Sequence, residues 1–285
     1  MFAQFTPVAA PTWRNPYQWP FASWSIWNLP IGKGAVYDPA TLEAPNQYIY
    51  EADPDVLILE PLAPNTTFYY NSAGWSGQNR CLAEGQALFA APFPPDFIVH
   101  SDGNNYSGAF LMPNNHTIRQ GQPVAHCSGK YIELFLPARS FLILFSVDGN
   151  VTLLVKAPTV DLYTDGILGA HGGSGLSSIG GTLRLGELLP GGYVARHALK
   201  TNLFARLNYY RNGTDKTSCY RWPAVTCDGY FDDLSQPLYY NGNNTAVRQG
   251  SLLALNATVD INKLGLTSEA GLNLAWTFQN YGGIQ

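Results

Sequence analysis

Acidic and imidazole side chains gather in a glycine-rich segment in the middle of the chain, residues 161–200. The segment holds Asp165, His171, Glu187 and His197 together with ten glycines. A histidine near a carboxylate can act as a general base, and a carboxylic acid in an apolar cleft can act as a general acid. Because glycine permits tight turns and close backbone approach, the segment could bring these groups together. We expect catalytic residues here, with Asp165 and His171 the first choices for proton transfer.

The reaction that such a set would serve is cleavage of a polysaccharide. Glycoside hydrolysis commonly uses two carboxyl groups about 5–9.5 Å apart. Asp165 paired with Glu187, or with Asp228 farther along the chain, could supply them. A polysaccharide lyase would use the same acid–base groups. The alternative is structural: Asp165–Gly166 is then a simple turn, and the histidines bond backbone groups.

A second group of residues, suited to binding, lies in the stretch YRWPAVTCDGY, residues 220–230. Aromatic faces stack on the apolar faces of sugar rings, and Arg and Asp side chains bond hydroxyl groups. Loops on a rigid scaffold commonly carry such recognition. We therefore expect Arg221, Trp222 and Tyr230 to hold a sugar. The alternative is that Trp222 is a core residue beneath the loop.

Other classes of site have weaker support. The stretch GAHGGSGLSSIGG lacks the frame of a phosphate-binding loop, and Leu176 stands where a serine nucleophile elbow needs glycine. A divalent metal ion held by His171, His197 and Asp161 or Asp165 is a less favoured alternative, because their spacing matches no known ligand motif. No cofactor is expected.

Four cysteines and seven N-x-S/T sequons indicate a secreted, extracellular glycoprotein. Disulfides are typical of oxidising compartments, and sequons accept glycans on exposed loops. We propose the pairs Cys81–Cys127 and Cys219–Cys227, although three pairings are open from sequence. The seven candidate glycosylation sites are Asn65, Asn105, Asn115, Asn150, Asn212, Asn243 and Asn256.

The composition excludes two kinds of partner. Charged residues make up 13% of the chain, the formal net charge is -4, and there is no basic run. A nucleic-acid partner requires clustered lysines and arginines, so none is expected. The most apolar stretch, residues 131–155, is interrupted by charged residues and proline. Since a spanning helix needs about 20 apolar residues, no membrane span is expected.

The sequence predicts a mainly β fold, a sandwich or jelly-roll-like arrangement of antiparallel sheets with long loops. Short runs rich in β-branched and aromatic residues recur between turn signals over residues 47–160. Residues 1–46 are rich in Pro and Trp, which predicts an extended arm on the domain surface. Residues 47–285 would then form a single β-rich domain.

The C-terminal third carries two more predicted strands and one helix. Residues 197–210 fit a helix or a strand, and we prefer a strand; residues 251–261 are also predicted to be a strand. Thr267 or Ser268 is the expected N-cap of a helix with Glu269 in its first turn. The chain has no signal-peptide pattern at its start and ends soon after this helix, which predicts a mature or truncated product.

Several motifs together resemble a broad set of secreted, largely uncharacterised proteins found mainly in bacteria. They include WNLPIGKGAVYDPA, HGGSGLSSIGGTLRLGEL, HALK, YRWPAVTCDGY, GSLLAL and LAWTFQNYGG, and they span most of the chain. The set is β-rich and has no settled activity. Its members typically carry Asp-Gly where this chain has Asn114–Asn115, and they continue beyond the YGG motif. The resemblance implies a secreted protein and a truncated C-terminus.

The first functional hypothesis is therefore an extracellular carbohydrate-active protein, most plausibly a polysaccharide-cleaving enzyme whose site is built by residues 161–200 and 219–230. The alternative is a non-catalytic secreted glycoprotein. It would be either a glycan-binding module or a self-assembling subunit of a wall, sheath or filament, with homo-oligomers as partners. Low charge, many aromatic residues and Pro-rich arms favour self-association.

Overall fold

In the computed structural model the chain divides into two compact units. Among the described residues, unit 2 comprises those within Asp53–Val160 and Gly169–His171, and unit 1 comprises the others. This division differs from the expected one at residue 46, because the 161–200 segment and the N-terminal arm belong largely to unit 1. The structure describes residue 15 and residues 18–43, 54–81, 85–101, 103–127, 132–135, 141–144 and 150–285.

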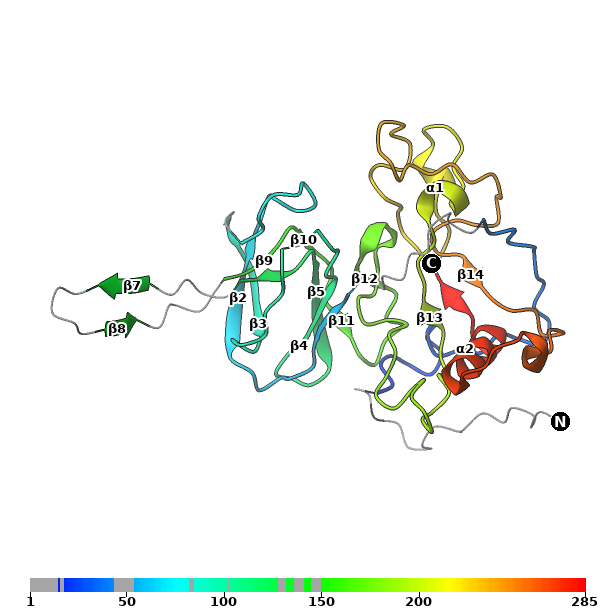
Figure 1. Cartoon of the computed structure of the whole chain (residues 1–285), viewed down its shortest axis with the longest axis horizontal. Coiled ribbons are helices and arrows are strands. Elements are labelled where there is room, and N and C mark those ends of the chain that lie inside the picture. The colour runs from blue at the N-terminus through cyan, green and yellow to red at the C-terminus, as the bar shows by residue number, and fades with distance from the viewer. Residues whose placement is uncertain are drawn as a thin grey trace. The chain divides into compact units, whose positions relative to one another are not determined.

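Unit 2 is a sandwich of two mixed sheets. In one sheet the order is β1–β4–β5–β10, with β11 also paired to β5; in the other it is β3–β2–β9–β6. Figure 1 shows β2, β3 and β9 on one side of this unit and β4 and β5 on the other. The strands are β1 (Val56–Ile58), β2 (Asn65–Tyr70), β3 (Ala87–Pro92), β4 (Gly108–Leu111), β5 (Thr117–Gln122), β6 (Ala125–His126), β9 (Val151–Leu153), β10 (Val155–Lys156) and β11 (Val160–Asp161).

Phenylalanines from both sheets form the core of unit 2. The ring of Phe68 on β2 lies 4.7 Å from that of Phe89 on β3 and 4.5 Å from that of Phe110 on β4. All three are buried, with Val56 and Leu153 in the same cluster. Such aromatic contacts bury large apolar side chains between the two sheets and help to hold them together.

The mainly β fold is confirmed, with one difference in strand direction. β1 pairs with β4 and β2 pairs with β9 in parallel, whereas β2–β3, β4–β5 and the separate hairpin β7 (Ile132–Phe135) with β8 (Phe141–Leu144) are antiparallel. Parallel neighbours require a crossover connection, which short-range turn signals do not reveal. The sheets are therefore mixed rather than wholly antiparallel.

Unit 1 has little regular structure around a three-stranded sheet of order β13–β15–β14. The chain covers it with turns and short helices, because glycine and proline interrupt every longer run. Its elements are β12 (Leu168–His171, whose last three residues lie in unit 2), η1 (Gly172–Ser174), β13 (Leu199–Lys200), α1 (Ala205–Asn208), η2 (Lys216–Ser218), β14 (Leu252–Leu253), η3 (Ile261–Lys263), α2 (Glu269–Asn280) and β15 (Gly283–Ile284).

The predicted C-terminal helix is present as α2. Ser268 is its N-cap, and its hydroxyl accepts a hydrogen bond from the backbone N–H of Gly271 at 3.1 Å. Glu269 stands in the first turn, where a negative charge favours the helix dipole. The two predicted strands are shorter than expected. Residues 197–210 give β13 and then the helix α1, and residues 251–261 give only β14 before η3 begins.

The N-terminal arm is not merely a surface segment. Trp27 is fully buried in unit 1, and its indole N–H donates to the backbone oxygen of Gly166 at 2.8 Å. A Cβ atom on Gly180 would overlap the Trp27 ring, and one on Gly166 would overlap Phe21. The density of glycines in residues 161–200 is thus explained partly by close backbone approach to buried aromatic rings. Residues 1–14, 16, 17 and 44–46 of the predicted arm lie outside the described residues.

Candidate functional site

Glu187 and His197 meet in the interior of unit 1. His197 Nε2 lies 2.9 Å from Glu187 Oε2, and the two side chains are 0% and 3% exposed. The other imidazole nitrogen, Nδ1, lies 2.9 Å from the backbone oxygen of Ala198. Because the enclosed pair does not reach solvent, a substrate cannot touch it. Two of the expected catalytic residues are therefore together, in a place suited to holding the fold rather than to chemistry.

The pKa of Glu187 reflects both burial and hydrogen bonding. Burial raises it, but hydrogen bonds from His197 and from the backbone N–H of Arg184 outweigh burial and leave that pKa below its ordinary value. The carboxylate of Glu187 thus has hydrogen-bond partners within the interior that offset its loss of water.

Asp165 occupies an exposed turn instead of a cleft. Its Oδ1 accepts a hydrogen bond from the backbone N–H of Ile167 at 3.1 Å, and the turn continues through Gly166 with φ of 63°. A short carboxylate that bonds the backbone two residues ahead is the usual aspartate turn. The structure thus brings Asp165 to neither Glu187 nor His197 within hydrogen-bonding reach, and the structural alternative describes it well.

His171 lies in unit 2, at the end of β12. Its Nε2 is 3.7 Å from Asp55 Oδ1, and the two side chains are 9% and 14% exposed. The nearby Ser107 hydroxyl donates to the backbone oxygen of Ala170 at 3.0 Å, which fixes the end of the strand. The expected partnership of His171 with Asp165 is not formed within either unit.

Among the expected catalytic residues, Asp228 has a carboxylate that accepts hydrogen bonds from several donors. Its Oδ2 accepts hydrogen bonds from the Tyr240 hydroxyl at 2.6 Å and from Gln249 Nε2 at 3.2 Å. Tyr230 and the backbone N–H of Gly173 also donate to this carboxylate. A Cβ atom on Gly173 would overlap Asp228 Oδ1, so only glycine allows the glycine-rich loop to come so close.

Burial governs the acid–base chemistry of this cluster. Desolvation raises the pKa of Asp228 above its ordinary value, although hydrogen bonds from Tyr240 and Tyr230 oppose the shift. Desolvation and the nearby carboxylate raise the pKa values of Tyr209 and Tyr240, so both phenols stay protonated donors. The cluster joins the glycine-rich loop to the 219–230 loop through Gly173 and Asp228 rather than through Asp165 and His171.

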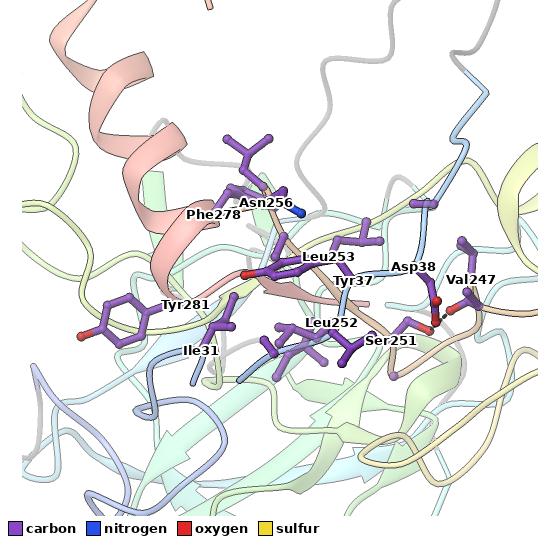
Figure 2. A pocket seen from close by; sticks show the side chains of 18 of the residues that line it. Ile31, Tyr37, Asp38, Val247, Ser251, Leu252, Leu253, Asn256, Phe278 and Tyr281 are labelled. Atoms are coloured by element: carbon purple, nitrogen blue, oxygen red, sulfur yellow. Dashed lines mark hydrogen bonds between the residues drawn. The ribbon is translucent and has the colours of Figure 1, made fainter. Parts of the chain in front are cut away.

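An open groove of about 1010 Å³ lies in unit 1, between the arm and the C-terminal elements. Figure 2 shows Tyr37 of the arm beside Leu253, with Tyr281 on the opposite side of the view from Asp38. Leu252, Asn256 and Phe278 also line the groove. The walls are mainly aliphatic and aromatic, and a few polar side chains interrupt them. Ligand pockets usually have this composition.

The arm crosses the groove as a segment attached at its two ends. At one end the backbone N–H of Ile31 donates to the oxygen of Asn280 at 2.7 Å. At the other end the Asn244 side-chain amide donates to the oxygens of Pro39 and Ala40 at 2.9 and 2.8 Å. Residues 32–36 between these attachments are exposed.

No protein-family model, curated protein or solved structure matches this chain. The resemblance to secreted proteins therefore stays a prediction.

Two of the three expected sugar-binding residues line the groove. Arg221 and Trp222 are both exposed there, and Trp222 is 69% exposed, so it is not a core residue. Tyr230 instead contributes to the Asp228 cluster. Sequence reasoning missed Tyr37 and Tyr281, which lie in segments far from residue 222. The sequence shows that the arm and the C-terminal YGG motif carry aromatic residues. Their spacing alone does not predict that they line one groove.

Both expected disulfides are present, Cys81–Cys127 and Cys219–Cys227. In the described part of the chain neither helix is long and apolar enough to cross a membrane, and no group of three His, Cys, Asp or Glu side chains could hold a metal ion. Asn105 is partly buried and accepts a hydrogen bond from the Trp75 indole at 2.8 Å. The exposed sequon asparagines are Asn65, Asn115, Asn150, Asn212, Asn243 and Asn256.

Proposed function

We propose that this protein is an extracellular carbohydrate-binding protein whose glycan chain lies in the groove of unit 1. The observation that carries the proposal is the position of Trp222. Its side chain is 69% exposed at the groove, on a loop closed by the Cys219–Cys227 disulfide. A large exposed indole costs free energy in water, whereas its face can stack on the apolar face of a sugar ring.

The rest of the groove supports an oligosaccharide as the ligand. Tyr37 and Tyr281 offer further aromatic surfaces, while Arg221, Asp38 and Asn256 offer donors and acceptors for hydroxyl groups. The volume of about 1010 Å³ stands at the upper end of the range for ligand pockets. A groove of that size suits several sugar units better than one.

The carboxylates favour binding over cleavage. Among the described residues that line the groove, Asp38 is the one carboxylate. Hydrolysis of a glycosidic bond commonly requires two, about 5–9.5 Å apart. Glu187 is enclosed and Asp165 lies in an exposed turn, so neither supplies the second carboxylate.

Polysaccharide cleavage is the second candidate, and the observation that favours it is Asp228. Its pKa is raised by burial, as is usual for a general acid. Release of reducing ends from mixed polysaccharides tests this candidate directly. Activity that disappears in Asp228→Asn would support it, and an unchanged release by that variant would exclude Asp228 as the acid.

The binding proposal is tested with a glycan array followed by calorimetry on the best ligand. Trp222→Ala should weaken binding about tenfold, since an aromatic contact is worth about 0.5–1.5 kcal/mol beyond its buried area. Trp24→Ala is the matched control, because Trp24 is 61% exposed in the same unit and does not line the groove. Absence of any glycan ligand, or equal affinities of the two variants, would overturn the proposal.

A further inference from the structure

Two arginines converge on one tyrosine ring in unit 1, in a part of the chain that lines no portion of the groove. Arg206 Cζ lies 5.1 Å from the centroid of the Tyr239 ring, and Arg211 Cζ lies 5.6 Å from it. Both guanidinium groups therefore lie close to the same aromatic ring. Cation–π attraction to tyrosine holds each of them against their mutual repulsion.

The two side chains are held differently. Arg211 is fixed, because its Nε donates to the backbone oxygen of Tyr240 and its Nη1 donates to that of Gly213 at 3.1 Å. Arg206 projects from α1 and is exposed, and among the described residues no group accepts a hydrogen bond from its guanidinium. Within the described part of the chain, the pair thus combines one rigid cation with one whose N–H groups have no acceptor and can bond a ligand.

Among the described residues, no carboxylate forms an ion pair with these two arginines. Within the described residues, no Asp or Glu oxygen lies within 4.0 Å of a nitrogen of Arg206 or Arg211. A third guanidinium, that of Arg248, lies 5.0 Å from the centroid of the Tyr210 ring. Hydrogen bonds from Thr217 lower the pKa of the Asp215 carboxyl, and the charge of Arg248 adds to that shift, so Arg248 has an acidic neighbour.

We propose that Arg206 and Arg211, on the ring of Tyr239, form a second binding site that takes the carboxylate or sulfate groups of an acidic polysaccharide. A guanidinium presents a planar fork of N–H groups that matches two oxygens of such an anion. The net charge of the protein is -4, so the attraction comes from this local pair rather than from the field of the whole molecule. The site is independent of the groove and of the function proposed for it.

The test is calorimetry of the full chain, made in a host that adds no glycans, with three oligosaccharides of equal length. One carries sulfates, one carries uronate carboxylates and one is neutral. We expect an acidic oligosaccharide to bind, and its affinity to fall as salt is raised. Arg206→Gln should weaken that binding about tenfold, as expected for loss of a charge-assisted contact, and Arg206→Lys should retain part of it.

Two controls make the outcome decisive. Lys263→Gln removes an exposed charge elsewhere in unit 1 and should leave the affinity unchanged. Trp222→Ala should affect binding in the groove and leave the salt-dependent binding intact. The proposal is overturned if neither acidic oligosaccharide binds, if Arg206→Gln binds as well as the unaltered protein, or if Trp222→Ala abolishes the acidic binding. The preferred acidic oligosaccharide identifies the anion as carboxylate or sulfate.

Discussion

His197 Nε2 and Glu187 Oε2 lie 2.9 Å apart in an enclosed contact that joins two turns of the glycine-rich segment. The backbone N–H of Arg184 donates to the same Oε2 at 2.8 Å, and the Ala198 oxygen accepts from the other side of the imidazole. Each polar atom at the contact thus has a partner. A buried pair of this kind costs much to break, because removing one member leaves a buried polar group without its partner.

Glu187→Gln should therefore destabilise unit 1 by about 3 kcal/mol at neutral pH. Urea unfolding, followed by tryptophan fluorescence, measures the change. Glu269→Gln is the control: Glu269 is exposed and accepts one hydrogen bond from the Gly191 N–H, so its substitution should cost less than about 1 kcal/mol. Equal effects of the two substitutions would show that the pair does not stabilise the fold.

The contribution of Asp228 to the free energy of unfolding should depend on pH with the sign expected of a raised pKa. The folded state holds the proton of this carboxyl more firmly than the unfolded chain does. Its contribution to stability is therefore fully present below the ordinary pKa of about 3.8, and it is lost as pH rises through the raised folded value. Asp228→Asn, which cannot ionise, should lack this decline.

Urea unfolding of both proteins at several pH values above about 4 measures that difference. The free energy of unfolding of Asp228→Asn, relative to the unaltered protein, should rise as pH increases. The contribution of Glu187 to stability should change with pH in the opposite direction, which provides an internal comparison. Its pKa is lowered, so its contribution is present above the ordinary value of 4.5 and is lost as pH falls through the folded value. A flat difference for Asp228→Asn would show that its carboxyl is not perturbed by folding.

Local patterns predicted the parts of this fold that local physics determines. Alternating β-branched and aromatic residues gave strands such as β2 and β4, and a serine followed by an acidic residue gave the start of α2. The proposed pairing of Cys219 with Cys227 is present, although the sequence left three pairings open. By contrast, local composition does not mark β5 as a strand, because its residues, Thr117–Gln122, are mostly polar and glycine-containing. Its place in the sheet comes from pairing with β4, which is a tertiary effect.

The candidate site was less predictable, because it depends on contacts between distant segments. Residue type and nearness in sequence grouped Asp165 with His171, but the turn at Gly166 leaves the aspartate exposed, and the histidine belongs to the other unit. Burial raises the pKa of Asp228, although hydrogen bonds from residues such as Tyr240 and Gly173 oppose the shift. The groove brings Tyr37 and Tyr281 into one lining. The spacing of these residues in the sequence does not predict these contacts. The glycines that drew attention to residues 161–200 largely accommodate neighbouring side chains such as Phe21 and Trp27.

The Cys219–Cys227 disulfide should matter more for binding than for overall stability, because it closes the loop that holds Trp222. Under the loop-entropy model, replacing both cysteines by serine costs about 2.5 kcal/mol. The longer Cys81–Cys127 loop should cost about 4 kcal/mol, and it belongs to unit 2, whereas the groove residues belong to unit 1. Without its disulfide the Trp222 loop must be ordered at the moment of binding, so glycan affinity should fall about tenfold.

Comparing the two double variants separates these effects. Cys219→Ser with Cys227→Ser should be the more stable protein and the weaker glycan binder, whereas Cys81→Ser with Cys127→Ser should unfold more easily and bind as the unaltered protein does. Calorimetry with the array-selected glycan, at a temperature where both variants are folded, measures the affinities. If the two variants bound the glycan equally well, the disulfide would not be needed to order the loop that holds Trp222. That result would contradict the proposal that Trp222 holds the glycan in the groove.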